Sequence, residues 1–167
     1  AMELRATGQS IILLEAGGKT RAGESQGLYR GALNDSVRHV PLDQARYRQL
    51  GGTTSLWGGR CLPFDSLDFD RREWVPYSGW PFSQKEMDDY YRRAHIYCEC
   101  GDYDYQVATA LPGAFPSMLP HFEDGDVSTS AIERWSPPTQ VGKAYRAALV
   151  KADNLRVVLH APVVELH

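Results

Sequence analysis

The sequence has little excess charge, few cysteines and no long apolar run, and each scarcity excludes a class of protein. Its 167 residues carry a formal net charge of −3, which provides no basic surface for nucleic acid. No apolar stretch approaches the length that spans a bilayer. The three cysteines, Cys61, Cys98 and Cys100, are an odd number without metal-type spacing. We therefore expect free thiols, no metal site, no membrane span and no nucleic-acid partner.

Glycine is concentrated in residues 48–60, the glycine-rich segment, which reads RQLGGTTSLWGGR. Glycines permit positive φ and let the main chain approach a bound group closely. If a helix begins here, its free N–H groups and the nearby hydroxyls would face an anion such as pyrophosphate. A tight turn between strands is the alternative, but two GG pairs cost more backbone entropy than a simple turn requires. We favour a ligand-binding loop.

The first residues predict a helix followed by a buried strand. Residues 1–6 are mostly helix formers, and Gly8 is a typical helix stop. Residues 10–14 form a short apolar run, typical of a strand covered on both faces in a parallel sheet. Glu15 follows this strand, at the position where dinucleotide-binding folds place the carboxylate that holds a ribose hydroxyl.

The spacing around Glu15 bears on how much of such a fold the sequence contains. In a dinucleotide-binding fold the glycine fingerprint lies about 20 residues before the acidic residue. Counting back from Glu15 passes the first residue of this sequence. We therefore expect a fragment that lacks the first strand and the phosphate turn. The alternative is a small protein that never had that turn.

Irregular segments separate the remaining elements. Residues 19–44 and 102–126 show no clear periodicity, and residues 61–81 are dense in Asp, Pro and aromatic residues. We interpret residues 61–81 as an ordered loop fixed by large side chains packing back on the body. A sugar-binding aromatic platform is the alternative.

The strongest local prediction is a helix that begins after a capping box at Ser83 and Glu86 and ends near Gly101. Its expected packed face comprises Met87, Tyr90, Tyr91, Ala94 and Tyr97. Further along we expect a strand within 127–135, a helix over 140–152 capped by Thr139, and strands at 155–159 and 163–166.

Several of these motifs, taken together, resemble the FAD-binding part of the glucose–methanol–choline (GMC) flavin oxidoreductases. The resemblance is carried by Leu14-Glu15-Ala16-Gly17-Gly18, the glycine-rich segment and the run 154–158, in that order. Residues 74–81 and the Tyr90-Tyr91 helix are similar to the sugar-oxidising and bacterial dehydrogenase branches of the family. The likeness covers nearly the whole chain.

The resemblance implies a fold and a division of the chain. It implies an α/β fold, a partial Rossmann-like FAD-binding domain with a long loop and a helical insertion. Residues 1–60 would belong to the FAD-binding domain, residues 61–126 would form the insertion, and residues 127–167 would return to the FAD-binding domain.

The resemblance also implies FAD as cofactor and assigns residues to it. Glu15, within the motif that continues with Ala16 and Gly17, would bind the adenosine ribose. The pyrophosphate and ribityl chain would lie along Gly51, Gly52, Thr53 and Thr54. The flavin ring would lie near Trp57, Gly58, Gly59 and Arg60. The adenine would contact the backbone of Val163. Leu56 stands where some sugar oxidases of the family attach FAD through a histidine, so we expect FAD to be bound non-covalently.

By the same resemblance, the reaction is hydride transfer from a CH–OH group of an alcohol or sugar to the flavin. The family's catalytic histidine lies further along than His167, and no residue here matches it. The partners would be that small-molecule substrate and the remaining polypeptide of the full-length enzyme. The alternatives are a non-catalytic module that binds a nucleotide or a partner and, less favoured, a carbohydrate-binding domain using Trp74, Trp80 and Trp135.

Overall fold

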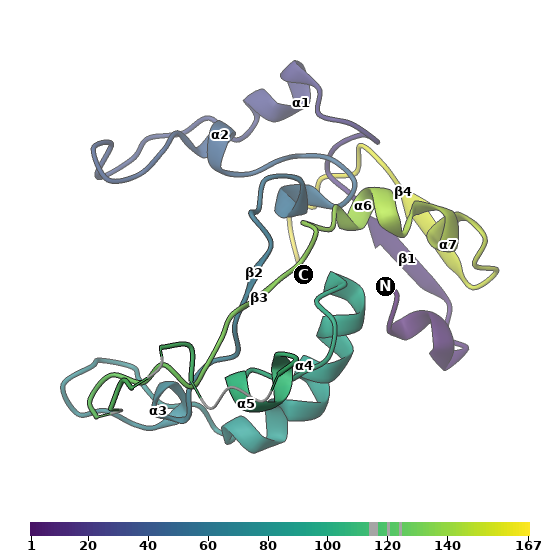
Figure 1. Cartoon of the computed structure of the whole chain (residues 1–167). Coiled ribbons are helices and arrows are strands. Elements are labelled where there is room, and N and C mark those ends of the chain that lie inside the picture. The colour runs from purple at the N-terminus through teal and green to yellow at the C-terminus, as the bar shows by residue number, and fades with distance from the viewer. Residues whose placement is uncertain (114–116, 120, 124) are drawn as a thin grey trace. The chain divides into compact units, whose positions relative to one another are not determined.

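The computed structural model describes residues 1–113, 117–119, 121–123 and 125–167 and has a mixed α/β fold (Figure 1). The chain divides into two compact units. Unit 1 comprises residues 1–57 and 139–167, and unit 2 comprises residues 58–138. The boundaries expected from the sequence were after residues 60 and 126, whereas the units divide after residues 57 and 138. No helix among the described residues combines the length and apolar character that crossing a bilayer requires.

Unit 1 is built on a parallel pair of strands, β1 (Ile11–Leu14) and β4 (Leu155–Val158), with Ile11 opposite Leu155 and Leu14 opposite Val158 (Figure 1). The prediction that residues 10–14 form a strand of a parallel sheet is confirmed. The prediction of burial on both faces is wrong, because burial alternates along β1 and Ile12 is 57% exposed. One face of β1 is therefore covered and the other lies open.

The helices of unit 1 are all short. They are η1 (Leu4–Thr7), α1 (Gly23–Gly27), α2 (Leu42–Ala45), η2 (Gly52–Ser55), α6 (Val141–Ala144) and α7 (Arg146–Val150). Gly8 ends η1 with a φ of 74°, as predicted, although the helix is shorter than expected. Helix α1 lies in residues 19–44, where no regular structure was expected, and α2 begins there.

Two predictions for the end of the chain are wrong. The single helix over 140–152 is interrupted at Tyr145, whose φ of −102° and ψ of 3° leave the helical region, and Gln140 rather than Thr139 precedes it. Residues 163–166 form no strand. His160, with a positive φ of 55°, redirects the chain after β4, and its N–H donates to the carbonyl of Gly17 instead.

Unit 2 contains β2 (Arg60–Cys61), α3 (Ser66–Phe69), α4 (Gln84–Cys98), α5 (Val107–Ala110) and β3 (Arg134–Trp135). Strands β2 and β3 pair antiparallel (Figure 1). The expected strand within 127–135 is thus confined to its last residues. Helix α5 lies within residues 102–126, parts of which fall outside the described residues.

The aromatic side chains of residues 61–81 pack back on the body only in part. Phe69 is buried, with its ring centroid 6.3 Å from that of Phe64 and 6.1 Å from that of Phe82. This packing fixes the segment as expected. Trp74 and Tyr77, however, remain exposed, so only some of its aromatic side chains pack back.

Helix α4 begins where the capping box predicts. The N–H and the Oγ of Ser83 donate to Glu86 Oε2 at 2.8 and 2.9 Å. The helix ends at Cys98, and Glu99 follows with a φ of 56°, before the expected stop at Gly101. Its buried face is rotated from the predicted one, because His95 is buried whereas Tyr90 and Ala94 are exposed.

The capping box makes helix stability depend on pH. Hydrogen bonds from Ser83 lower the pKa of Glu86, so the ionised carboxylate stabilises the folded chain above the unfolded pKa of about 4.3. This contribution is lost as the pH falls through the lower folded pKa. Glu86→Gln should therefore lower the melting temperature near neutral pH, and the difference from wild type should shrink below about pH 4.

Thermal unfolding followed by circular dichroism from pH 3 to pH 7, about the range over which carboxylates titrate, tests this prediction. Asp89→Asn removes an exposed carboxylate further along α4 and is the matched control. If the melting temperature of Glu86→Gln stays below that of wild type by the same amount across this pH range, the ionised Glu86 carboxylate does not stabilise the helix.

Candidate functional site

The glycine-rich segment meets the chain at the point where β1 ends. Gly18 and Gln49 form a parallel bridge, and the N–H of Leu50 donates to the carbonyl of Gly18 at 2.9 Å. At Gly17 a side chain is excluded, because a Cβ there would lie 2.0 Å from the carbonyl oxygen of Arg48. The strand end and the glycine-rich segment, far apart in sequence, therefore form one site.

Glu15 is held at the carboxyl edge of this pair of strands. Its N–H donates to Val158 at 2.9 Å, and its carbonyl accepts the N–H of Ala161 at 2.9 Å. The half-buried side chain accepts the N–H of Gly17 through Oε1 at 2.7 Å. A carboxylate has two acceptor oxygens, so Oε2 can accept a hydrogen bond from a ligand hydroxyl.

Gly51 brings the glycine-rich segment against helix α6. It has a φ of 90°, and a Cβ there would lie 2.3 Å from the nitrogen of Gly142. Thr54 joins the same two elements, since its Oγ1 donates to the Gly51 carbonyl at 2.6 Å and accepts the N–H of Val141 at 3.2 Å. The hydroxyl of Thr54, predicted to lie along the pyrophosphate, thus also caps the first turn of α6.

The other predicted pyrophosphate residues are less constrained. Gly52 has a φ of 53°, and the nearest atom to a Cβ there is the Tyr47 carbonyl oxygen at 3.8 Å. Thr53 is exposed. Both begin η2, a single turn of 3-10 helix, so the expected helix is present only as one turn.

A hollow of about 260 Å³ lies beside this segment and is rich in cations. Lys19, Lys143 and Arg146 contribute three positive side chains, and Gln49 and Ser55 contribute polar groups. The other lining residues are Thr20, Leu50, Gln140 and Gly142. The three cations were not predicted from the sequence, because they come from two distant segments and form no local motif.

The residues assigned near the flavin are divided between the units. Trp57 belongs to unit 1 and donates from Nε1 to the carbonyl of Thr139 at 3.0 Å. Gly58, Gly59 and Arg60 belong to unit 2. Arg60 forms a two-pronged ion pair with Glu133, and its hydrogen bonds lower the pKa of that carboxyl.

Two further residues assigned to the cofactor are Ala16, whose backbone is hydrogen-bonded, and Val163, which is exposed. The carbonyl of Ala16 accepts a hydrogen bond from Arg48 Nη2 at 3.3 Å. Val163 is exposed and lies outside any strand. The structure thus brings Glu15, Gly17 and the start of the glycine-rich segment together, whereas Val163 is not held by a strand.

Comparisons with known proteins identify no relative. No protein-family model, curated protein or solved structure matches this chain. Interpretation of the site therefore depends on its geometry and on the sequence motifs.

The contact between the glycine-rich segment and α6 should be sensitive to one methyl group. Gly142 is buried, and a Cβ there would lie 1.9 Å from the carbonyl oxygen of Leu50. Gly142→Ala should lower the free energy of unfolding by about 1–3 kcal/mol, the usual cost of overpacking. Gly27→Ala is the control, because a Cβ at Gly27 meets no described atom within 4 Å.

Urea unfolding of both variants measures this difference. Equal stability of Gly142→Ala and Gly27→Ala would refute the close backbone approach at Gly142.

Proposed function

We propose that this chain is part of a GMC-type, FAD-dependent oxidoreductase and that unit 1 contributes to its Rossmann-like FAD-binding domain. The observation that carries the proposal is the meeting of Glu15, at the carboxyl edge of a parallel strand pair, with the glycine-rich segment. Parallel α/β folds bind dinucleotides at this edge. The motifs quoted above give the same family by resemblance.

Glu15 is suited to bind the adenosine ribose. Its backbone is fixed by hydrogen bonds to Val158 and Ala161, and Gly17 orients the carboxylate through one oxygen. The other oxygen can then accept a ribose hydroxyl without any rearrangement of the strand. Such a charge-assisted hydrogen bond is stronger than one between neutral groups.

The cationic hollow is suited to the diphosphate. Lys19, Lys143 and Arg146 line it together with the amide of Gln49. Arg146 Nη2 donates to the Lys19 carbonyl at 3.3 Å, which leaves its other N–H groups available to an anion. Three cations that line a hollow of about 260 Å³ would neutralise a ligand with two negative charges.

FAD bound by these residues would supply the redox chemistry, as acceptor of a hydride from the CH–OH carbon of an alcohol or sugar. The role of the residues described here is to bind and orient the cofactor. By resemblance, the histidine that takes the hydroxyl proton belongs to the remaining polypeptide of the enzyme. A non-catalytic nucleotide-binding module would use the same two groups, and it would bind ADP as tightly as FAD.

Removing the carboxylate tests the ribose assignment. Glu15→Ala should weaken FAD binding by about 1.5–3 kcal/mol, because a hydrogen bond to a charged group is lost. Glu15→Gln, which keeps an acceptor for the Gly17 N–H, should also bind FAD more weakly than wild type. Calorimetric titration of the whole chain with FAD and with ADP measures both effects.

Glu24→Ala is the matched control, since Glu24 is an exposed carboxylate of the same unit. Unchanged FAD affinity in both Glu15 variants would remove the ribose assignment.

Removing the cations tests the diphosphate assignment separately. Lys143→Gln and Arg146→Gln should each weaken ADP and FAD binding by about 0.5–1 kcal/mol at low salt, the usual range for exposed charges. The loss should shrink as the salt concentration rises. Adenosine, which has no phosphate, should bind wild type and variants equally.

Lys151→Gln, at an exposed lysine that follows α7, is the control. A loss of adenosine binding equal to the loss of ADP binding would show that the hollow does not recognise phosphate.

A further inference from the structure

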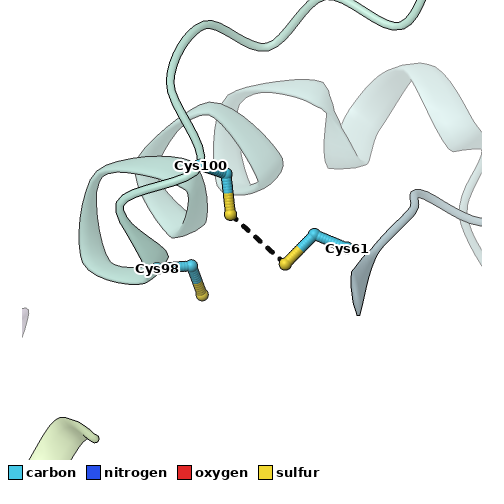
Figure 2. Close-up of side chains that lie close together, drawn as sticks. All are labelled: Cys61, Cys98 and Cys100. Atoms are coloured by element: carbon cyan, nitrogen blue, oxygen red, sulfur yellow. Dashed lines mark hydrogen bonds between the residues drawn. The ribbon is translucent and has the colours of Figure 1, made fainter. Parts of the chain in front are cut away.

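The three cysteines of the chain meet in unit 2 although they come from two distant segments. Cys61 ends β2, Cys98 ends α4, and Cys100 follows in the turn after the helix (Figure 2). Their sulfur atoms all lie within 4.8 Å of one another, and Cys100 Sγ donates to Cys61 Sγ at 3.2 Å. None of the three forms a disulfide, as the sequence predicted. We call this group the thiol cluster.

The turn after α4 fixes two of the three sulfurs. Glu99 adopts the left-handed region with a φ of 56°, and the N–H of Cys100 then donates to the carbonyl of His95 at 3.1 Å. His95 is itself buried and contacts the Gly101 carbonyl through Nδ1 at 3.0 Å and the Tyr105 hydroxyl through Nε2 at 2.8 Å. Cys98 and Cys100 are therefore held on one rigid turn.

The third sulfur is fixed by the short sheet. Cys61 pairs with Arg134 in the antiparallel register of β2 and β3. Arg134 Nε donates in turn to the carbonyl of Asp104 at 2.9 Å. The thiol cluster thus joins two preformed backbone elements, so a ligand would find its donor atoms already gathered.

The spacing of the sulfurs suits one soft metal ion. Sulfurs bound to a single Zn²⁺ at about 2.3 Å lie about 3.7 Å apart in a tetrahedron, and the thiol cluster, with all sulfurs within 4.8 Å, needs only small side-chain rotations to reach this. Cys100 is buried, whereas Cys61 and Cys98 are partly accessible. The accessible side provides room for a water molecule as fourth ligand.

The three sulfurs lie so close together that their thiolate forms would repel one another. A divalent cation removes the repulsion between neighbouring thiolates and makes their ionisation favourable.

We propose that Cys61, Cys98 and Cys100 form a three-thiolate Zn²⁺ site with water as the fourth ligand. On binding, each thiol releases its proton to solvent and forms one Zn–S bond, with no change in oxidation state. The site lies within unit 2 and is independent of the proposed nucleotide-binding function of unit 1. The absence of metal-type spacing along the sequence concealed it.

Metal titration of the whole chain under anaerobic, reducing conditions tests the proposal. One equivalent of Zn²⁺ should bind, protons should be released, and the affinity should rise with pH because the thiols must ionise. Co²⁺ in place of Zn²⁺ should give thiolate-to-metal charge-transfer absorption and the intense visible bands of tetrahedral coordination.

Cys61→Ser, Cys98→Ser and Cys100→Ser should each lower Zn²⁺ affinity by more than about 100-fold, the upper end of the loss caused by removing an outer-shell partner. His39→Gln removes an exposed loop histidine and should leave binding unchanged. Even if a serine variant fails to fold, the Co²⁺ spectrum of the wild type shows whether thiolates bind the metal.

Failure of wild type to bind one equivalent would overturn the proposal, as would undiminished binding by Cys61→Ser. Isolation of metal-free protein with a Cys61–Cys100 disulfide would also overturn it, because the cluster would then be a redox pair.

Discussion

Unit 1 depends on backbone segments that approach one another so closely that side chains are excluded. Gly17 lies against the carbonyl of Arg48, and Gly51 and Gly142 bring the glycine-rich segment against α6. A Cβ at any of these positions would lie within 2.3 Å of a backbone atom. These contacts place the end of β1, the glycine-rich segment and the start of α6 together, and the candidate site is made of these three elements.

These contacts show which glycines are required for packing and which are not. Gly17 and Gly51 are explained by close backbone approach, whereas Gly58 has open space beside it among the described residues. Thr54 likewise caps α6 and so is a structural residue. The best-supported ligand groups are therefore the Glu15 carboxylate and the cationic hollow. A glycine-rich motif alone does not distinguish packing from ligand binding, because both require backbone without a side chain.

Unit 2 buries apolar, polar and sulfur-bearing side chains, among them Phe69, His95 and Cys100. His95 connects the end of α4 to Tyr105 and to the turn at Gly101, and burial raises the pKa of Tyr105 to about 12. These hydrogen bonds fix the turn that carries Cys98 and Cys100. The turn therefore holds two of the three sulfurs of the proposed metal site in place.

The sequence by itself determined the local features whose cause is local. The capping box of α4, the stop at Gly8 and the β1 strand ending in Glu15 all follow from neighbouring residues. The tertiary structure decided the rest, because its causes lie far apart in the chain. The break at Tyr145 and the loss of a strand at residues 163–166 depend on packing and on the turn at His160. The cationic hollow and the thiol cluster exist only where distant segments meet, which no spacing along a single chain reveals.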